Sequence, residues 1–322
     1  MLHKIIIAAV AAFTVIASAA AQNYPTRPVR FIVPFAPGGN TDVQGRLIAQ
    51  KLTEAWSQQV VVDNRAGAGG TVGVEMLAKA PADGYTIALA SFGNILVGPS
   101  LFPKLGYDPL QDLAPVVLVS QPPGLLVVNP GLPVKNVGEL IAYAKANPGK
   151  LNFGSAGNGT SHHLVGELYK MRTGTDLVHV PYKGAGPMMQ DLLGGNVDMA
   201  FDGMGTSAPQ IKGGKLRALA VSTPTRSPLI PEVPTLSELG VPDFEVTTWY
   251  AIWAVKGTPK DVIDRMYREV AKALQNDDIR KIWEQQGAVP GGQPPAEFAR
   301  FVRSEVLRWG KVVKDAHIKI DH

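Results

Sequence analysis

The clearest chemical pattern in the chain is LNFGSAGNGTSHH, residues 151–163. Its apolar start predicts a short buried strand, its glycines and hydroxyl residues predict a loop, and Leu164 and Leu168 begin the apolar face of a helix. A helix start leaves backbone N–H groups unpaired and carries partial positive charge, so this loop suits an anion. Because it holds hydroxyls but no strong acid or base, the pattern favours gripping a carboxylate over reacting with one. The alternative is that Thr160 or Ser161 merely caps the helix.

A second glycine loop precedes another helix near the start of the chain. The apolar run 29–35 predicts a strand covered on both faces, and PGGNTD follows it. Asp42 falls in the first turn of the next helix, where a carboxylate suits the helix dipole, and this is its simpler explanation. Ser91 and Asn94 follow a third expected strand, beyond whose carboxyl end ligands collect in open α/β sheets.

Other polar residues follow or flank the expected elements of the second half. Tyr182 and Lys183 come after a strand expected at 177–180, and a solvated loop lysine is the alternative for Lys183. Asp202 follows the buried run 197–201, and a carboxylate there needs a partner or a ligand because desolvating it alone is costly. His162, at a helix start, is a candidate for touching the ligand, with plain packing as the alternative.

Patterns for catalysis, metals and nucleotides do not match. Ser155 is not in a G-x-S-x-G motif because position 153 is Phe. His162 and His163 are neighbours, so on a helix they point about 100° apart, and no H-E-x-x-H is present. The glycines of residues 67–73 lack the spacing of a dinucleotide fingerprint. We therefore expect no metal, no cofactor and no enzymatic activity.

The bulk properties indicate an exported protein with two lobes. Residues 1–21 have a short basic start, an apolar core and a small-residue end, the pattern of a secretory signal peptide. The remaining length of about 300 residues exceeds what one hydrophobic core usually organises. With 0 cysteines the chain has neither a disulfide scaffold nor a thiolate metal site. The net charge of +4, without a basic stripe, does not favour nucleic acid.

Strand and helix patterns alternate along the chain, which predicts an α/β fold with parallel sheets and crossover helices. The stretch QPPG at 121–124 and the Pro-rich stretch 223–242 are expected to cross between the lobes. The apolar strand at 249–255 is expected to return to the first lobe. The expected division is a signal peptide at 1–21, lobe 1 at 22–121 plus 243–322, and lobe 2 at 122–242.

Ordered motifs along essentially the whole mature chain resemble the Bug family, the periplasmic solute receptors of tripartite tricarboxylate transporters. They are YPTRPVRFIVPFAPGGNTD, VVVDNRAGAGGTVG, ADGYTIALAS, LNFGSAGNGTSHHL, VPYKGAGPMMQDLLGG, VDMAFD and GKLRALAVST. The resemblance implies a type II periplasmic-binding-protein fold, with two lobes, two crossing strands and a ligand enclosed between the lobes. It also implies a receptor in the periplasm that closes on an organic carboxylate and delivers it to a membrane transporter.

The resemblance also implies a set of ligand-binding residues. In that family the loop matching 155–161 holds a ligand carboxylate, and the loop matching 35–42 approaches from the other lobe, often through ordered water. The candidate ligand-binding residues are Phe35, Gly38, Gly39, Thr41, Asp42, Ser91, Asn94, Ser155, Gly157, Asn158, Gly159, Thr160, Ser161, His162, Tyr182, Lys183 and Asp202.

One departure from the family pattern affects the expected ligand. Where relatives often have small polar residues, this chain has Phe92-Gly93-Asn94-Ile95-Leu96. We therefore expect a more apolar pocket wall, which favours an aromatic or branched carboxylate over a small polar diacid.

The expected partners are a small organic acid and, transiently, membrane transporter subunits, with no nucleic acid, and the expected form is a monomer. Two other functions stay open. One is a secreted hydrolase or lyase that uses His162, Lys183 or Asp202 for proton transfer. The other is a sensory receptor that presents its closed form to a membrane signalling partner.

Overall fold

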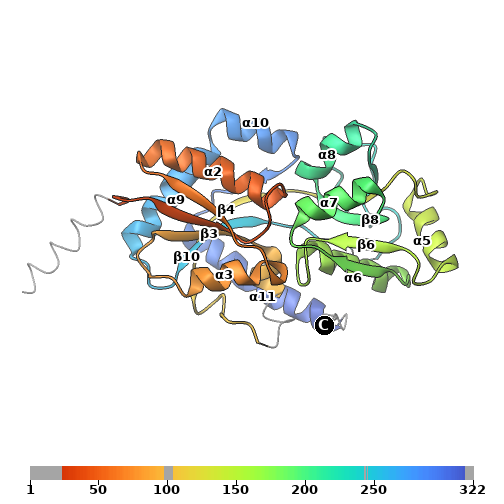
Figure 1. Ribbon diagram of the computed structural model, residues 1–322, viewed down its shortest axis with the longest axis horizontal. Coiled ribbons are helices and arrows are strands. Elements are labelled where there is room, and N and C mark those ends of the chain that lie inside the picture. Colours follow the sequence, from red (N-terminus) through yellow and green to blue (C-terminus); the bar gives the residue numbers. More distant parts are fainter. Residues whose placement is uncertain (1–23, 98–103, 243, 245, 316–322) are drawn as a thin grey trace, which may run out of the picture.

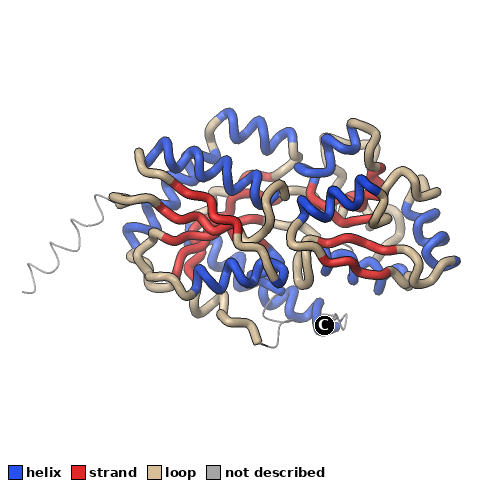
Figure 2. The backbone as a smooth tube through the Cα atoms, viewed as in Figure 1, coloured by secondary structure: helices blue, strands red, loops and turns tan. Residues whose placement is uncertain are grey.

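The computed structural model describes residues 24–97, 104–242, 244 and 246–315. Its strands form two separate sheets, which lie side by side along the longest axis and are flanked by helices (Figures 1 and 2). The predicted two-lobed α/β fold is thus confirmed. The predicted signal peptide lies outside the described residues. Among those described, no helix has the length and apolar character to cross a membrane.

The six-stranded sheet and its helices form what we call lobe 1. The strands, in spatial order, are β11 (Val289–Pro290), β4 (Leu113–Gln121), β10 (Tyr250–Val255), β3 (Thr86–Ser91), β1 (Val29–Val33) and β2 (Val60–Asn64). The helical segments are α2 (Asn40–Trp56), η1 (Ala68–Gly70), α3 (Thr71–Ala78), η2 (Gly93–Val97), α9 (Lys260–Leu274), α10 (Asp277–Gln285) and α11 (Pro295–Asp315). Strand β1 pairs in parallel with β2 and β3. Helix α9 buries Val262, Met266 and Val270, so its apolar face follows the helical period.

The five-stranded sheet and its helices form lobe 2. The strands, in spatial order, are β7 (Val178–Pro181), β6 (Asn152–Ser155), β8 (Met199–Gly203), β5 (Gly124–Val128) and β9 (Arg217–Val221). The helices are α5 (Val137–Ala146), α6 (Ser161–Thr173), α7 (Ala185–Gly194) and α8 (Met204–Lys212). Strand β6 pairs in parallel with β7 and β8. Each parallel strand therefore runs directly toward the helix that follows it.

Neither sheet is wholly parallel, which corrects the expectation from the alternating pattern. Strand β10 runs antiparallel to β3 and β4, and β5 runs antiparallel to β8 and β9. Each of these strands is the first that the chain forms after it changes lobes. Each of these two strands starts at the edge of its sheet that faces the other lobe. Its neighbours end at that edge, so the strand runs antiparallel to them.

The two crossings lie next to each other, but the second comes later than predicted. The first is Gln121 to Gly124, as expected. The segment after β9 instead stays against lobe 2, because the amide of Val221 donates to Pro234 O and that of Leu236 donates to Val221 O. The second crossing is fixed near Thr248, whose hydroxyl donates to the carbonyl oxygen of Pro122 at 3.2 Å.

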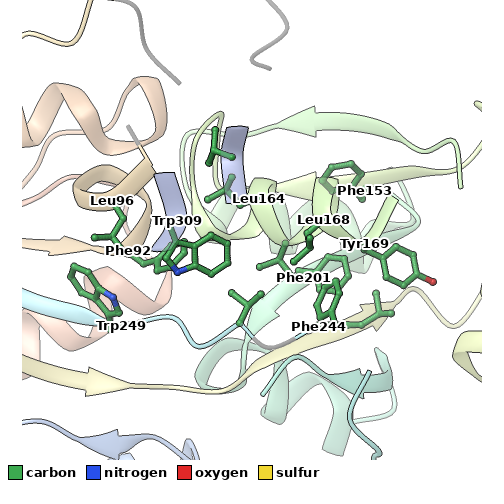
Figure 3. Close-up of a cluster of buried hydrophobic side chains, with 14 of the residues drawn as sticks. Phe92, Leu96, Phe153, Leu164, Leu168, Tyr169, Phe201, Phe244, Trp249 and Trp309 are labelled. Carbon is green, nitrogen blue, oxygen red and sulfur yellow. The ribbon is translucent and has the colours of Figure 1, made fainter. Parts of the chain in front are cut away.

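A single cluster of buried apolar side chains spans both lobes. Figure 3 shows Phe92 and Trp309 of lobe 1 together with Leu164 and Leu168 of α6 in lobe 2. Trp309 packs edge-on against Phe92, with ring centroids 4.6 Å apart. The C-terminal helix α11 therefore supplies an aromatic anchor where the lobes meet.

This packing predicts the effect of truncating Trp309, which is 3% exposed. We expect Trp309→Ala to lower the free energy of unfolding by about 3–5 kcal/mol, because it removes a large buried ring and leaves a cavity. Urea denaturation measures the change. The control on the same helix is Leu307→Ala, which removes a side chain that is 77% exposed and should stay within about 0.5 kcal/mol of wild type. Equal effects of the two substitutions would contradict the anchoring role.

Candidate functional site

A cavity lies between the two lobes, and the space within it, including the part that is open to solvent, is about 350 Å³. Lobe 1 lines it with Phe35, Gly39, Asn40, Thr41, Ser91 and Tyr250. Lobe 2 lines it with Ala156, Thr160, Ser161, His162 and Ala185. The two predicted glycine loops, which lie far apart in the sequence, therefore face one space.

Three helices begin at this cavity. Asn40 and Thr41 start α2, Ser161 and His162 start α6, and Ala185 starts α7. The first N–H groups of a helix have no partner within the helix, and the helix dipole adds partial positive charge. None of the lining side chains is a lysine or an arginine. Partial positive charge at this cavity therefore comes from backbone dipoles and not from charged side chains.

The loop before α6 combines capping with exposure to the cavity. The Thr160 hydroxyl accepts from the amide of His163 at 3.4 Å and donates to the carbonyl of Gly157 at 2.7 Å. Gly157 and Gly159 have φ angles of +126° and +74°, which residues other than glycine rarely adopt. Thr160 therefore is the helix cap, and it also lines the cavity together with Ser161.

Ser155 lies behind the cavity wall. It is fully buried, its oxygen accepts from the amide of Gly157 at 3.0 Å, and it lies 2.6 Å from His179 Nε2. Burial, with nearby His163 and Lys170, lowers the pKa of His179 to about 3. This serine–histidine pair does not meet the demands of acyl transfer, because the hydroxyl is enclosed and the imidazole is a weak base.

Asp202 lies inside strand β8 opposite Leu125, and not beyond the strand end as predicted. Its Oδ2 accepts from the hydroxyls of Thr206 at 2.5 Å and Ser207 at 2.7 Å. Its Oδ1 has no hydrogen-bond partner among the described residues and lies 4.0 Å from His162 Nε2. One buried oxygen of this carboxylate thus remains available beside a cavity-lining residue.

His162 is the titratable partner of Asp202. Burial lowers the pKa of His162, and the Asp202 carboxylate works in the opposite direction. Because burial prevails, the imidazole is neutral near pH 7. Its Nδ1 is buried and has no hydrogen-bond partner in the described part of the chain. A neutral imidazole next to the cavity adds polarity without adding charge.

Asp42 has structural partners. Its carboxylate accepts from the Gly38 amide at 3.1 Å, from Arg46 at 3.0 Å and from Asn64 at 3.0 Å. Burial raises its pKa, but these hydrogen bonds outweigh burial, so the pKa of Asp42 is lowered. The carboxylate orders the first glycine loop and does not line the cavity.

A second, outer hollow of about 460 Å³ adjoins the cavity. Phe35 and Ala156 line both spaces. The outer hollow holds four more predicted residues, Gly157, Asn158, Tyr182 and Lys183, opposite the glycines of residues 67–70. The predicted residues that line a space thus divide between an inner cavity and its outer neighbour, whereas Gly38, Asp42, Asn94, Ser155, Gly159 and Asp202 line neither.

The expectation of an apolar cavity wall at residues 92–96 is wrong. Phe92, Ile95 and Leu96 are at most 1% exposed and belong to the core that spans the lobes. Asn94 is also buried, and its Oδ1 accepts from the amide of Ser91 at 2.9 Å. Segment η2 contacts α11, and Phe92 packs against Trp309 of that helix. Gly38 and Gly159 line neither hollow.

Sequence reasoning missed Asn40, Ala156, Ala185 and Tyr250 as lining residues. Asn40 and Ala156 sit next to predicted residues in the two glycine loops, and Ala185 comes two positions after Lys183, so the loop pattern itself could have included them. Tyr250 begins a strand within a strongly apolar run that gives no hint of a site. Burial raises the pKa of Tyr250 to about 12, so its hydroxyl is a neutral hydrogen-bonding group.

The backbones of the two lobes touch around the cavity. The Ala36 amide donates to the carbonyl oxygen of Lys183 at 3.1 Å. A Cβ at Gly93 would lie 2.7 Å from Gly159 O, and a Cβ at Gly186 would lie 2.6 Å from Pro37 O. A Cβ at Gly69 would collide with Asn158 O. The structure is therefore a closed arrangement, which glycines on both sides make possible.

Comparisons with known proteins agree with this architecture. The model of the family described as "Tripartite tricarboxylate transporter family receptor" matches residues 45–318. Protein BugT of Bordetella pertussis is 42% identical over 305 residues, which is 94% of this chain and 94% of BugT.

Solved structures show the same fold. Rpa4515 of R. palustris, solved with adipate, is 40% identical and has a TM-score of 0.89, covering 92% of this chain and 99% of that chain. MatC (Rpa3494) of Rhodopseudomonas palustris, with bound malate, is 34% identical and has a TM-score of 0.87, covering 90% of this chain and 100% of that chain.

The contact at Gly93 predicts a way to hold the lobes apart. Gly93 has no left-handed φ, so Gly93→Ala should fold, but its methyl group would meet Gly159 O and the Thr160 Cα of lobe 2. We expect a larger radius of gyration by small-angle X-ray scattering. The control is Gly194→Ala, where the nearest atom is Asn196 Nδ2 at 3.6 Å. A wild-type radius for Gly93→Ala, at conditions where wild type is closed, would contradict the contact.

Proposed function

The chain belongs to the family of tripartite tricarboxylate transporter receptors, and from this membership and its cavity we propose a solute receptor for an organic carboxylate. The observation that carries the proposal is the convergence of three helix starts, from both lobes, on a cavity without cationic side chains. Such starts bind anions through backbone N–H groups. Relatives whose structures contain adipate or malate support a carboxylate as the ligand class.

The ligand carboxylate binds at the start of α6 and faces α2. Ser161 and His162 supply the unpaired N–H groups, and the Ser161 hydroxyl adds a further donor. On the lobe 1 side of the cavity, Asn40 and Thr41 supply the N–H groups at the start of α2. Hydrogen bonds to a charged group contribute about 1.5–3 kcal/mol each. Because they come from both lobes, the ligand favours the closed arrangement.

The other end of the ligand meets Asp202 and His162. The free Asp202 Oδ1 requires a hydrogen-bond donor, which a ligand hydroxyl, a ligand ammonium group or a bridging water supplies. This end of the cavity is polar, so a polar acid fits better than the aromatic acid that residues 92–96 suggested. The chain binds this acid without converting it, since neither Ser155 nor His179 lines the cavity.

The receptor works by hinge closure in the periplasm. The signal peptide at residues 1–21 directs export. In the mature chain, lobe 1 is residues 22–121 plus the part that follows the second crossing near Thr248, and lobe 2 is the part between the two crossings. The adjacent crossings at Pro122 and Thr248 act as the hinge between them. The closed monomer then delivers its acid to membrane transporter subunits in a transient contact.

A ligand screen tests the function. We expect native mass spectrometry and thermal shift of the mature protein to select a few acids from a panel that includes malate, succinate, adipate and benzoate. An acid at a hundred times its dissociation constant stabilises the fold by about 2.7 kcal/mol, which shifts the melt visibly. If amines or sugars shift the melt and no acid does, the carboxylate assignment is wrong even though the fold stands.

The loop before α6 gives a site-specific prediction. We expect Thr160→Ala/Ser161→Ala to weaken binding of the selected acid by about tenfold or more, because two hydroxyls and the order of the helix start are lost. Isothermal titration measures the affinity. Asn136→Ala is the matched control, because it removes the cap of α5, whose side chain accepts from the Glu139 amide.

Both variants lose a helix cap, which costs about 0.5–2 kcal/mol of stability. Asn136→Ala should nevertheless bind the acid like wild type. Unchanged affinity in a folded Thr160→Ala/Ser161→Ala protein would reject the assignment of this loop.

A further inference from the structure

Three aromatic rings are stacked behind the loop that precedes α6. The ring of His179 on β7 lies between Phe153 of β6 and His163 of α6. Its centroid is 4.9 Å from that of Phe153 and 4.2 Å from that of His163, with interplanar angles of 24° and 22°. The stack thus joins three elements of lobe 2, and it does not line the cavity.

Each imidazole of the stack fixes one backbone amide of the loop. The Gly159 N–H donates to His163 Nδ1 at 3.2 Å. The Gly157 N–H donates to Ser155 Oγ, which lies 2.6 Å from His179 Nε2. His179 therefore acts on Gly157 through Ser155, whereas His163 acts on Gly159 directly.

The bond to His163 requires a neutral imidazole, and the pKa of His179, lowered to about 3 chiefly by burial, makes that ring neutral as well. His163 Nδ1 accepts a hydrogen bond, so it carries no proton. Since the Ser155 oxygen already accepts from Gly157, its own proton is free to point at an unprotonated His179 Nε2. The charged or titratable groups that influence His179 are His163 and Lys170, both on α6, and Lys170 is paired with Glu167 at 3.0 Å. Neither Phe153 nor Ser155, which face His179 from β6, titrates.

We propose that Ser155, His163 and His179 are positioning residues that hold Gly157 to Thr160 in the shape that presents the start of α6 to the ligand. The part that concerns the ligand rests on the proposed function. The loop needs such support because both its glycines have positive φ and lose much conformational freedom on folding. Without these hydrogen bonds the loop would have to become ordered each time a ligand binds. The loss of conformational entropy would then lower the affinity.

Three substitutions separate the hydrogen bond from packing. Ser155→Ala deletes the link to Gly157. His179→Phe keeps a flat ring in the stack but removes the acceptor, and His179→Gln restores a neutral acceptor. Ser222→Ala is the matched control, because Ser222 is also buried in lobe 2 and its hydroxyl donates to Val246 O at 2.9 Å.

The ligand-free measurement is amide hydrogen exchange at Gly157. We expect exchange about tenfold faster or more in Ser155→Ala and His179→Phe, near wild type in His179→Gln, and unchanged in Ser222→Ala. Wild-type exchange in folded Ser155→Ala would overturn the proposal. So would a Gly157 that exchanges equally fast in Ser222→Ala, because the effect would then be a general loss of stability.

The second measurement is affinity for the acid that the screen selects, with malate and adipate as first probes. We expect Ser155→Ala and His179→Phe each to weaken binding about tenfold, and the double variant to be no weaker than either single one, because both remove the same link. Additive losses would overturn the shared link. If wild type binds no acid at all, the proposed function fails, while the exchange measurement still decides the role of the stack.

Discussion

Backbone N–H groups that a helix cannot pair internally are the interaction on which this molecule depends. In both lobes parallel strands run to one edge and the next helix starts there, and the two edges face each other. The starts of α2, α6 and α7 therefore meet at one cavity. A site made of such dipoles needs no buried lysine or arginine, which would be an uncompensated charge whenever the site is empty.

Closing the lobes brings these groups together, and close approach of the backbones is the condition for it. Where Gly93, Gly69 and Gly186 meet the opposite lobe, a Cβ would lie closer than ordinary contact allows. The lobes are also joined by the two crossings, which lie together, and by the core they share, in which Trp309 packs. The relative motion is thereby limited to a hinge rather than a separation.

The sequence sufficed for the fold and for the glycine loops, because their signals are local. The apolar run of β1, the period of α9 and the turn before α6 each follow from neighbouring residues. What it could not provide is which way a side chain faces once elements pack. Ser155 looks like a loop hydroxyl, yet it points at His179, which is 24 positions away. Phe92 follows a strand end at the cleft, yet it packs against Trp309.

The direction of the crossings could not be read from the sequence either, since an antiparallel strand and a parallel strand have the same apolar pattern when both faces are buried. Tyr250 shows the consequence for the site. Tyr250 is the first residue of β10, which follows the second crossing and lies between β3 and β4. This pairing places Tyr250 in the lining of the cavity. Pairing between strands that are far apart in the sequence therefore determines that Tyr250 lines the cavity, and the residues next to Tyr250 do not indicate this.

The ligand anion that we propose would bind near the buried carboxylate of Asp202, and each of the two anions has its own helix start. Asp202 precedes α8, and its Oδ2 accepts from Thr206 and Ser207 in the first turns of that helix. The ligand carboxylate that we propose would instead face α2, α6 and α7, whose first residues line the cavity. Neutral His162 lines the cavity, and its Nε2 lies 4.0 Å from Asp202 Oδ1. Because each anion has its own dipoles, the site can hold a buried carboxylate and still attract another, provided that the nearer end of the ligand brings a donor to Asp202.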